Sequence, residues 1–229
     1  MSGTVTVTRA LDAVVVLCGG ASRRMGQDKA LARLGDASLL ERATAAASLA
    51  APRVLLATGT AERYGEIARE NGREVVLDRT ADGGPLAGIE AALACLARGS
   101  EAETGAWLGI LAVDMPFASA EVLERCAARA EREGLDAVFL ATERGVEPLC
   151  GAVHTRALPA VTAALARGER RAIAYHAELA VGTIGLDELP AHVAAARPDV
   201  NVNTPGDLAG LEETAIKRGP ATPVQEDRS

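Results

Sequence analysis

The chain has 229 residues, of which 48% are hydrophobic and 24% are charged, and its formal net charge is -7 at pH 7. This composition is ordinary for a globular protein, and the length predicts a single domain. Only 2% of the residues are aromatic. Few aromatic platforms and an acidic balance argue against a polyanion-binding surface, so we expect no nucleic acid among the partners.

No apolar stretch reaches the length of a membrane span, and the N-terminus lacks the pattern of a signal peptide. We therefore expect no membrane association and a cytoplasmic location. The four cysteines show no Cys-x-x-Cys spacing and lie in apolar surroundings, which predicts buried free thiols in a reducing compartment. Residues 1–10 and 218–229 are polar and are predicted to be flexible tails of a domain that spans 11–217.

Short, continuous apolar runs predict strands that are covered on both faces, at 13–17, 53–57, 74–77, 107–113 and 136–140. Ala-rich amphipathic stretches between them predict helices at 37–50, 61–71, 85–98 and 119–133. This alternation predicts a Rossmann-like, three-layer α/β fold with a mostly parallel sheet.

The pattern changes in the last third of the chain. There we expect a strand at 148–153, helices at 155–167 and 171–179, and a strand at 181–184. Thr204 is a good N-cap with Pro205 after it, which predicts a final helix that ends near residue 217.

The loop after the first predicted strand carries a glycine pair, Gly19-Gly20, followed by three cations. The glycines alone fit a tight turn that needs a positive φ. The addition of Arg24 and Lys29 favours a phosphate cradle, in which backbone amides and cations meet an anionic ligand. Arg23 is expected to face solvent. The loop is neither a Walker A motif nor a dinucleotide fingerprint, because the required spacings are absent.

Two aspartates follow predicted strands, and in parallel sheets ligands bind at the carboxyl ends of the strands. Asp114 precedes Met115-Pro116, which stiffens the turn, and its carboxylate beside bound phosphates is what Mg²⁺ needs. Capping of the next turn is the alternative reading, and metal binding is favoured. Asp78 follows its strand in the same way. For this residue, the sequence supports a binding role and the capping of a turn equally.

Three other segments have a plain and a functional interpretation. Gly84 lies in the Gly-rich lead-in to the helix at 85–98, whose first amides could face an anion, although a plain loop explains it nearly as well. Asn201 and Asn203 alternate to one face of an extended segment, which could point both amides into a site or be only a strand edge and an N-cap. Residues 169–171 read as a solvated helix start or as charge for a second anionic ligand.

Taken together, these segments resemble the MobA family of molybdenum cofactor guanylyltransferases, within the nucleotidyltransferase superfamily. The matching motifs appear in family order and span about residues 13–210: Leu17-Cys18-Gly19-Gly20 with Arg24-Met25-Gly26 and Asp28-Lys29, Gly84-Pro85-Leu86-Ala87-Gly88-Ile89, Val113-Asp114-Met115-Pro116, Gly168-Glu169-Arg170-Arg171 and Asn201-Val202-Asn203-Thr204-Pro205. The chain departs from the family in three ways. Cys18 stands where alanine is usual, the spacing to Lys29 is one residue shorter than in some members, and residues 58–60 replace an asparagine that some members have.

The resemblance implies one nucleotidyltransferase domain that binds GTP and Mg²⁺. It implies transfer of GMP to the phosphate of molybdenum-bound molybdopterin, with release of pyrophosphate. Arg24, Lys29 and Asp114 are assigned to catalysis. Nucleotide and metal binding is assigned to Leu17, Cys18, Gly19, Gly20, Lys29, Asp78 and Asp114, and further substrate contacts are expected at Gly84, Asn201 and Asn203.

Positioning and charge neutralisation would supply the rate of such a reaction, with no side-chain nucleophile and no dedicated general base. The implied partners are GTP, molybdopterin and maturation proteins of molybdoenzymes. One alternative is a related nucleotidyltransferase that uses CTP or another phosphorylated acceptor. Another is a non-catalytic nucleotide-binding module.

Overall fold

The computed structural model describes residues 10–19, 28–99 and 105–218, with side chains up to residue 211. A seven-stranded sheet forms their centre, with the strand order β5-β4-β1-β6-β8-β7-β9. The strands of this sheet are β1 (Ala13–Leu17), β4 (Arg53–Ala57), β5 (Glu74–Val76), β6 (Trp107–Ala112), β7 (Ala137–Thr142), β8 (Gly145–His154) and β9 (Val181–Gly185). A separate antiparallel ribbon consists of β2 (Arg33–Leu34) and β3 (Ala37–Ser38).

Four neighbouring strands of the sheet run in the same direction. β1 pairs in parallel with β4 and β6, and β4 pairs in parallel with β5. β8 lies antiparallel between β6 and β7, and β9 adds to β7 in parallel. The mostly parallel α/β sheet predicted from the sequence is therefore confirmed, and the carboxyl ends of β5, β4, β1 and β6 lie along one edge.

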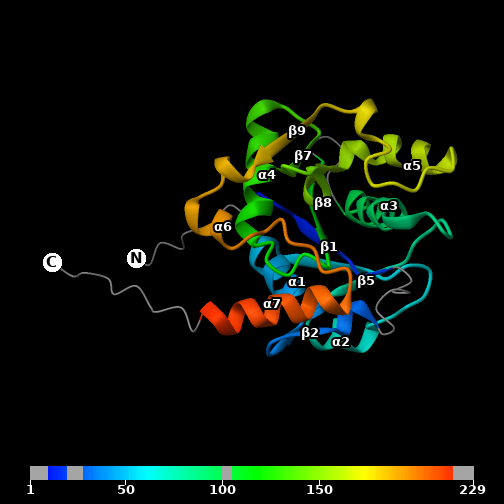
Figure 1. The fold of residues 1–229 in the computed structure, drawn as a ribbon. Helices are drawn as coiled ribbons and strands as arrows, with labels where there is room; N and C mark the ends of the chain where they lie inside the picture. Colours follow the sequence, from blue (N-terminus) through cyan, green and yellow to red (C-terminus); the bar gives the residue numbers. More distant parts are fainter. Residues whose placement is uncertain (1–9, 20–27, 100–104, 219–229) are drawn as a thin grey trace, which may run out of the picture.

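Helices cover both faces of the sheet, which gives three layers (Figure 1). α3 (Gly84–Ala97) and α5 (Leu158–Ala166) pack against each other on one face, and α1 (Leu39–Ala50) and α4 (Ala120–Glu133) do so on the other. The remaining helices are α2 (Gly65–Glu70) beside β5, α6 (Ala191–Ala195), and α7 (Pro205–Arg218), which runs past β2. None of the helices in the described part of the chain has both the length and the apolar character that crossing a lipid bilayer requires.

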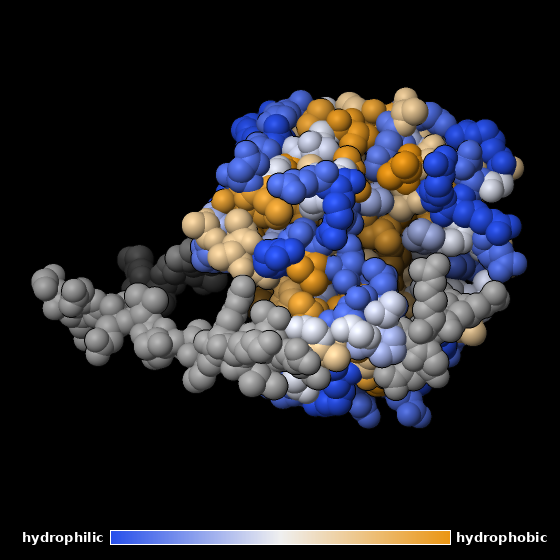
Figure 2. All heavy atoms as spheres, in the orientation of Figure 1, coloured by the Kyte–Doolittle hydropathy of each residue, from blue (hydrophilic) through white to orange (hydrophobic). Residues whose placement is uncertain are grey.

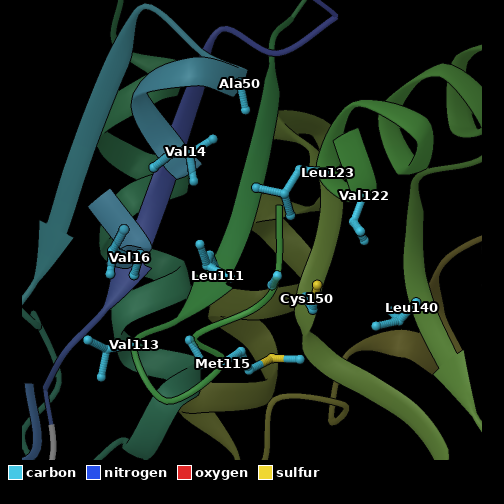
Figure 3. Close-up of a cluster of buried hydrophobic side chains, with 14 of the residues drawn as sticks. Val14, Val16, Ala50, Leu111, Val113, Met115, Val122, Leu123, Leu140 and Cys150 are labelled. Carbon is cyan, nitrogen blue, oxygen red and sulfur yellow. The ribbon is translucent and has the colours of Figure 1, made fainter. Parts of the chain in front are cut away.

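The central strand is buried on both sides. Val14 and Val16 face α1 and α4 and pack with Leu111 and other side chains of that layer (Figure 3), whereas Val15 faces α3 and α5. All five residues of β1 are buried. Because neither face meets water, the strand reads as a continuous apolar run and not as an alternation.

Local boundaries differ from the sequence predictions where tertiary contacts decide them. The helix expected at 171–179 is wrong: only a 3₁₀ turn, His176–Glu178, is present, because the segment inserts the fully buried Tyr175 into the core. The helix expected at 61–71 is shortened to α2. α1 begins at Leu39 because Ser38 forms a capping box with Glu41.

Two further helical segments are also refined. The helix expected at 155–167 begins with a 3₁₀ turn, Thr155–Ala157, before α5, and α6 was not predicted. The predicted tails lie outside the described residues except for residues 10 and 218, so their flexibility and the domain limits stay predictions.

Gly151 in β8 has no room for a side chain. A Cβ there would overlap the carbonyl oxygen of Val138 and lie 2.6 Å from Phe139 Cδ1, whereas nothing lies within 4 Å of a Cβ at Gly210 in α7. Gly151→Ala is expected to lower the free energy of unfolding by at least about 2 kcal/mol. Gly210→Ala is expected to raise it by roughly 0.5–1 kcal/mol. Urea denaturation measures both, and equal effects would contradict the close packing at Gly151.

Candidate functional site

A cavity of about 1030 Å³ opens at the edge where β1, β4, β5 and β6 end. Figure 2 shows the hollowed face of the molecule, with hydrophobic residues deep in the hollow and hydrophilic residues around it. Most residues predicted for the site line the cavity: Leu17, Cys18, Gly19, Lys29, Asp78, Gly84, Asp114 and Asn203. Gly20, Arg23 and Arg24 fall in the segment 20–27, which lies outside the described residues.

The loop after β1 starts from a rigid base. The Cys18 amide donates a hydrogen bond to the Ala57 carbonyl oxygen of β4 (3.0 Å), and the Val113 amide donates to the Leu17 carbonyl oxygen (3.2 Å). A Cβ at Gly19 would lie 2.7 Å from the Gly59 amide nitrogen. Glycine is therefore required at this position, because two loop backbones approach each other there.

Cys18 has a structural role at the cavity wall. Its thiol donates to the Ala57 carbonyl oxygen (3.3 Å), and only 6% of the residue is exposed. Burial raises the pKa of this thiol to about 12. A raised pKa favours the protonated thiol at neutral pH, which is a weaker nucleophile than the thiolate.

Lys29 and Asp114 form an ion pair near the carboxyl ends of β1 and β6. Lys29 Nζ lies 2.7 Å from Asp114 Oδ2 and donates to Asn203 Oδ1 at 3.2 Å. The side chains of the pair are only 17% and 24% exposed. The Val202 amide donates to the Asp114 carbonyl oxygen (2.8 Å), which ties the asparagine segment to this turn. Three residues predicted from separate motifs thus meet at one point.

Of the two asparagines, Asn203 lines the cavity and Asn201 does not. Asn201 is absent from the cavity lining in the described part of the chain, and its Nδ2 lies 3.5 Å from Glu147 Oε2 of β8. The predicted N-cap is present, because the Asp207 amide donates to Thr204 Oγ1 (3.2 Å). The amides of Asn203 and Thr204 in turn both donate to Asp207 Oδ2, which fixes the start of α7.

Asp78 lies at the other end of the cavity. Its amide donates to the Gly59 carbonyl oxygen (2.8 Å), which joins the β4 and β5 loops. A Cβ at Gly88 in α3 would lie 2.9 Å from Leu17 Cδ2 and 3.7 Å from Asp78 Oδ1. Burial, and then the negative charge of Glu90, raise the pKa of Asp78. The helix α3 therefore approaches β1 closely enough to enclose this carboxylate.

Gly84 joins two distant loops. It has a φ of +61°, and a Cβ there would lie 2.9 Å from the carbonyl oxygen of Arg170. Glycine is thus required by both conformation and space. Arg170, which the sequence left between a solvated and an anion-binding role, also lines the cavity.

Sequence reasoning missed Arg63 and Leu149, which line the cavity as well. Arg63 Nη2 donates to the Thr58 carbonyl oxygen (3.2 Å), and its Nη1 lies 3.9 Å from Asp28 Oδ2. Neither residue lies in a recognisable motif. For Arg63, the available signal was its position shortly after a predicted strand of the parallel sheet, and Leu149 lies within the strand predicted at 148–153.

Comparison with known proteins identifies the family. Residues 14–180 match the family model described as "MobA-like NTP transferase domain". The chain belongs to this family. It is therefore a nucleotidyltransferase enzyme, as the motifs predicted.

Relatives of this MobA-like chain align with it over most of their length. A "Probable molybdenum cofactor guanylyltransferase" from Deinococcus radiodurans is 37% identical over 202 residues, which cover 86% of this chain and 91% of that protein. A protein of the same name from Carboxydothermus hydrogenoformans is 32% identical over 198 residues, which cover 86% of this chain and 93% of that protein. The crystal structure of "Molybdopterin-guanine dinucleotide biosynthesis protein A" from Archaeoglobus fulgidus superposes with a TM-score of 0.73 at 28% identity, covering 89% of this chain and 98% of that one. These similarities confirm the α/β nucleotidyltransferase fold.

The raised pKa of Asp78 predicts that its negative charge destabilises the fold at neutral pH. Its charged form is less favourable in the folded chain than in the unfolded chain, so stability is lost as the pH rises through the raised pKa. Asp78→Asn is expected to raise the Tm at pH 7. This gain should shrink as the pH falls toward about 4, the ordinary range of an aspartate.

Thermal unfolding followed by circular dichroism across this pH range measures the effect. The control is Asp36→Asn, because the Asp36 side chain is 99% exposed. It is expected to give no such pH-dependent gain. A gain for Asp78→Asn that stays constant with pH would contradict an origin in the buried charge.

Proposed function

We propose that this MobA-like nucleotidyltransferase transfers GMP from GTP to the terminal phosphate of molybdenum-bound molybdopterin and releases pyrophosphate. The observation that carries the proposal is the Lys29–Asp114 pair in the cavity at the strand ends. The relatives named as molybdenum cofactor guanylyltransferases support the choice of substrates.

The reaction exchanges one phosphoanhydride for another. An oxygen of the pterin phosphate forms a bond to the α-phosphorus of GTP, and the bond from that phosphorus to the β-phosphate oxygen breaks. The attacking phosphate is already anionic and needs no base. The protonated thiol of Cys18 is consistent with a reaction that uses no side-chain nucleophile. Charge gathers on the leaving pyrophosphate, where Lys29 and Arg24 would neutralise it.

The residues at Asp114 fit Mg²⁺. In the part of the chain that the structure describes, no group of three or more His, Cys, Asp or Glu side chains could hold a metal ion. Mg²⁺ suits such a sparse site, because it takes one or two carboxylates together with substrate phosphates and several waters. Asp114 would hold the ion, which would supply charge stabilisation at the phosphates. Lys29 already shares this carboxylate and would lie beside the same phosphates.

The nucleoside would occupy the opposite side of the cavity. The backbone of Leu17, Cys18 and Gly19 borders this space, and Asp78 would accept hydrogen bonds there. Gly84 leaves room where α3 begins, and Asn203 would face the phosphates beside Lys29.

A cytoplasmic location belongs to the same proposal. All four cysteines are unpaired, as expected in a reducing compartment. Maturation proteins of molybdoenzymes are the proposed recipients of the product, because a finished dinucleotide cofactor must be passed to the enzyme that uses it.

Pyrophosphate release tests the choice of nucleotide. The enzyme is supplied with Mg²⁺, molybdenum-bound molybdopterin, and GTP, CTP, ATP or UTP in separate reactions. Release with GTP alone is the expected result. Release with CTP would instead place the enzyme with nucleotidyltransferases of the alternative specificity. If folded protein released no pyrophosphate with any nucleotide, while a control enzyme was active under the same conditions, the proposal would be contradicted.

Asp114→Asn tests the metal-binding role. It is expected to lower kcat about 100-fold or more, because the amide cannot replace the carboxylate in holding the cation. Circular dichroism should show an unchanged fold. Asp36→Asn, at a fully exposed carboxylate, should retain wild-type activity. Chelation of divalent cations should abolish turnover and added Mg²⁺ should restore it; full activity of Asp114→Asn would exclude the assignment.

A further inference from the structure

Tyr64 has an unusual backbone conformation. It lies at φ +61° and ψ +17°, in the left-handed region, directly before α2. A bulky side chain rarely adopts this conformation, and holding it there costs free energy that other contacts must offset. The Tyr64 side chain does not cap its own helix. Its contacts elsewhere must therefore explain why the residue is held there.

The Tyr64 hydroxyl contacts Asp28, the residue directly before the cavity-lining Lys29. It donates a hydrogen bond of 2.6 Å to Asp28 Oδ2, over a sequence separation of 36 residues. The other oxygen, Asp28 Oδ1, accepts a hydrogen bond from the Ala30 amide (3.1 Å) and so caps the 3₁₀ turn Lys29–Leu31. One carboxylate thus links the tyrosine to the backbone turn that carries Lys29.

The position of Lys29 depends on that turn. A lysine side chain is long and flexible, so its direction is fixed only if its backbone and its head group are both held. The head group contacts Asp114 and Asn203, and the backbone is held through Asp28. We propose that Tyr64 is a positioning residue, whose hydroxyl holds Asp28 so that Lys29 stays beside Asp114. The catalytic part of this inference rests on the proposed function.

Arg63 is the competing support for Asp28. Its Nη1 lies 3.9 Å from Asp28 Oδ2, which is too long for a hydrogen bond. Its guanidinium instead donates to the Thr58 carbonyl oxygen and lies 5.7 Å from the centroid of the Tyr64 ring. The tyrosine hydroxyl therefore makes the shorter and more directional contact with this carboxylate.

The composition of the chain supplies a matched experiment. The chain has two tyrosines, Tyr64 and Tyr175, and two lysines, Lys29 and Lys217. The Tyr175 hydroxyl is fully buried and has no hydrogen-bond partner within the described residues. Tyr64→Phe and Tyr175→Phe therefore remove the same atom, once with the proposed partner and once without one.

The first readout needs no nucleotide. An amine-acylating reagent labels the full chain, and mass spectrometry compares the labelling rate of Lys29 with that of Lys217 in each variant. Tyr64→Phe is expected to raise the relative rate at Lys29 several-fold, because the lysine is released from Asp114. Tyr175→Phe is expected to match the wild type. An unchanged labelling rate of Lys29 in Tyr64→Phe would overturn the proposal. It would indicate that Arg63, and not Tyr64, holds Asp28 in place.

The second readout is kinetic and uses the nucleotide that the wild type turns over. Tyr64→Phe is expected to lower kcat about 10- to 100-fold, with less than about a threefold change in KM, because Lys29 meets charge that develops on the leaving group. In a Lys29→Ala background the same substitution should cause little further loss. A fully additive loss would overturn the route through Lys29. If the wild type were inactive with every nucleotide, the proposed function would fail, while the labelling result would still decide the role of Tyr64.

Discussion

The ion pair between Lys29 and Asp114 is the contact on which the arrangement of the site depends. It joins residues 85 positions apart, one after β1 and one after β6, the two neighbouring strands at the centre of the sheet. Removing two charges from water is costly unless the geometry is good and further hydrogen bonds satisfy both groups. The Lys29 ammonium group donates a further hydrogen bond to Asn203 Oδ1. The Val202 amide donates to the carbonyl oxygen of Asp114 and so holds its backbone. The parallel pairing of β1 with β6 and the path of the chain before α7 therefore both contribute to the position of this pair.

Close approaches between backbones give the rest of the cavity its shape. Gly19 meets Gly59, and Gly84 meets Arg170, at separations that exclude a Cβ. These contacts draw the loops after β1, β4 and β5 and the start of α3 around one space. The sheet sets the direction of each loop, and the glycines set how near the loops come. Small and aliphatic side chains make up much of the lining, and Figure 2 shows hydrophobic residues in the hollow of one face with hydrophilic residues around it.

The sequence predicted those parts of the molecule that depend on local pattern. The apolar runs identify the strands, because helices cover both faces of the sheet and side chains on both sides of a strand are buried. Thr204 and Pro205 mark the start of α7 because capping is a local interaction. The alternation of Asn201 and Asn203 failed to bring both into the cavity, since Glu147 on β8 lies beside the first amide. The pairing of Tyr64 with Asp28 has no sequence signal at all, because it exists only once two loops are brought together. Residues 20–27, which carry Arg24, lie outside the described residues, so that assignment remains a prediction.

Charge explains how an acidic chain can serve an anionic substrate. Lys29, Arg63 and Arg170 line the cavity together with Asp78, Asp82 and Asp114, so charges of both signs face the cavity. Lys29 and Asp114 neutralise each other there. A nucleotide that arrives with a divalent cation would give each member of this pair a partner of opposite charge, without leaving either charge buried alone. An uncomplexed nucleotide would satisfy the lysine and repel the aspartate. Under the proposed function, the Lys29–Asp114 pair would therefore favour the metal complex of the nucleotide over the free anion, without a net positive charge on the protein.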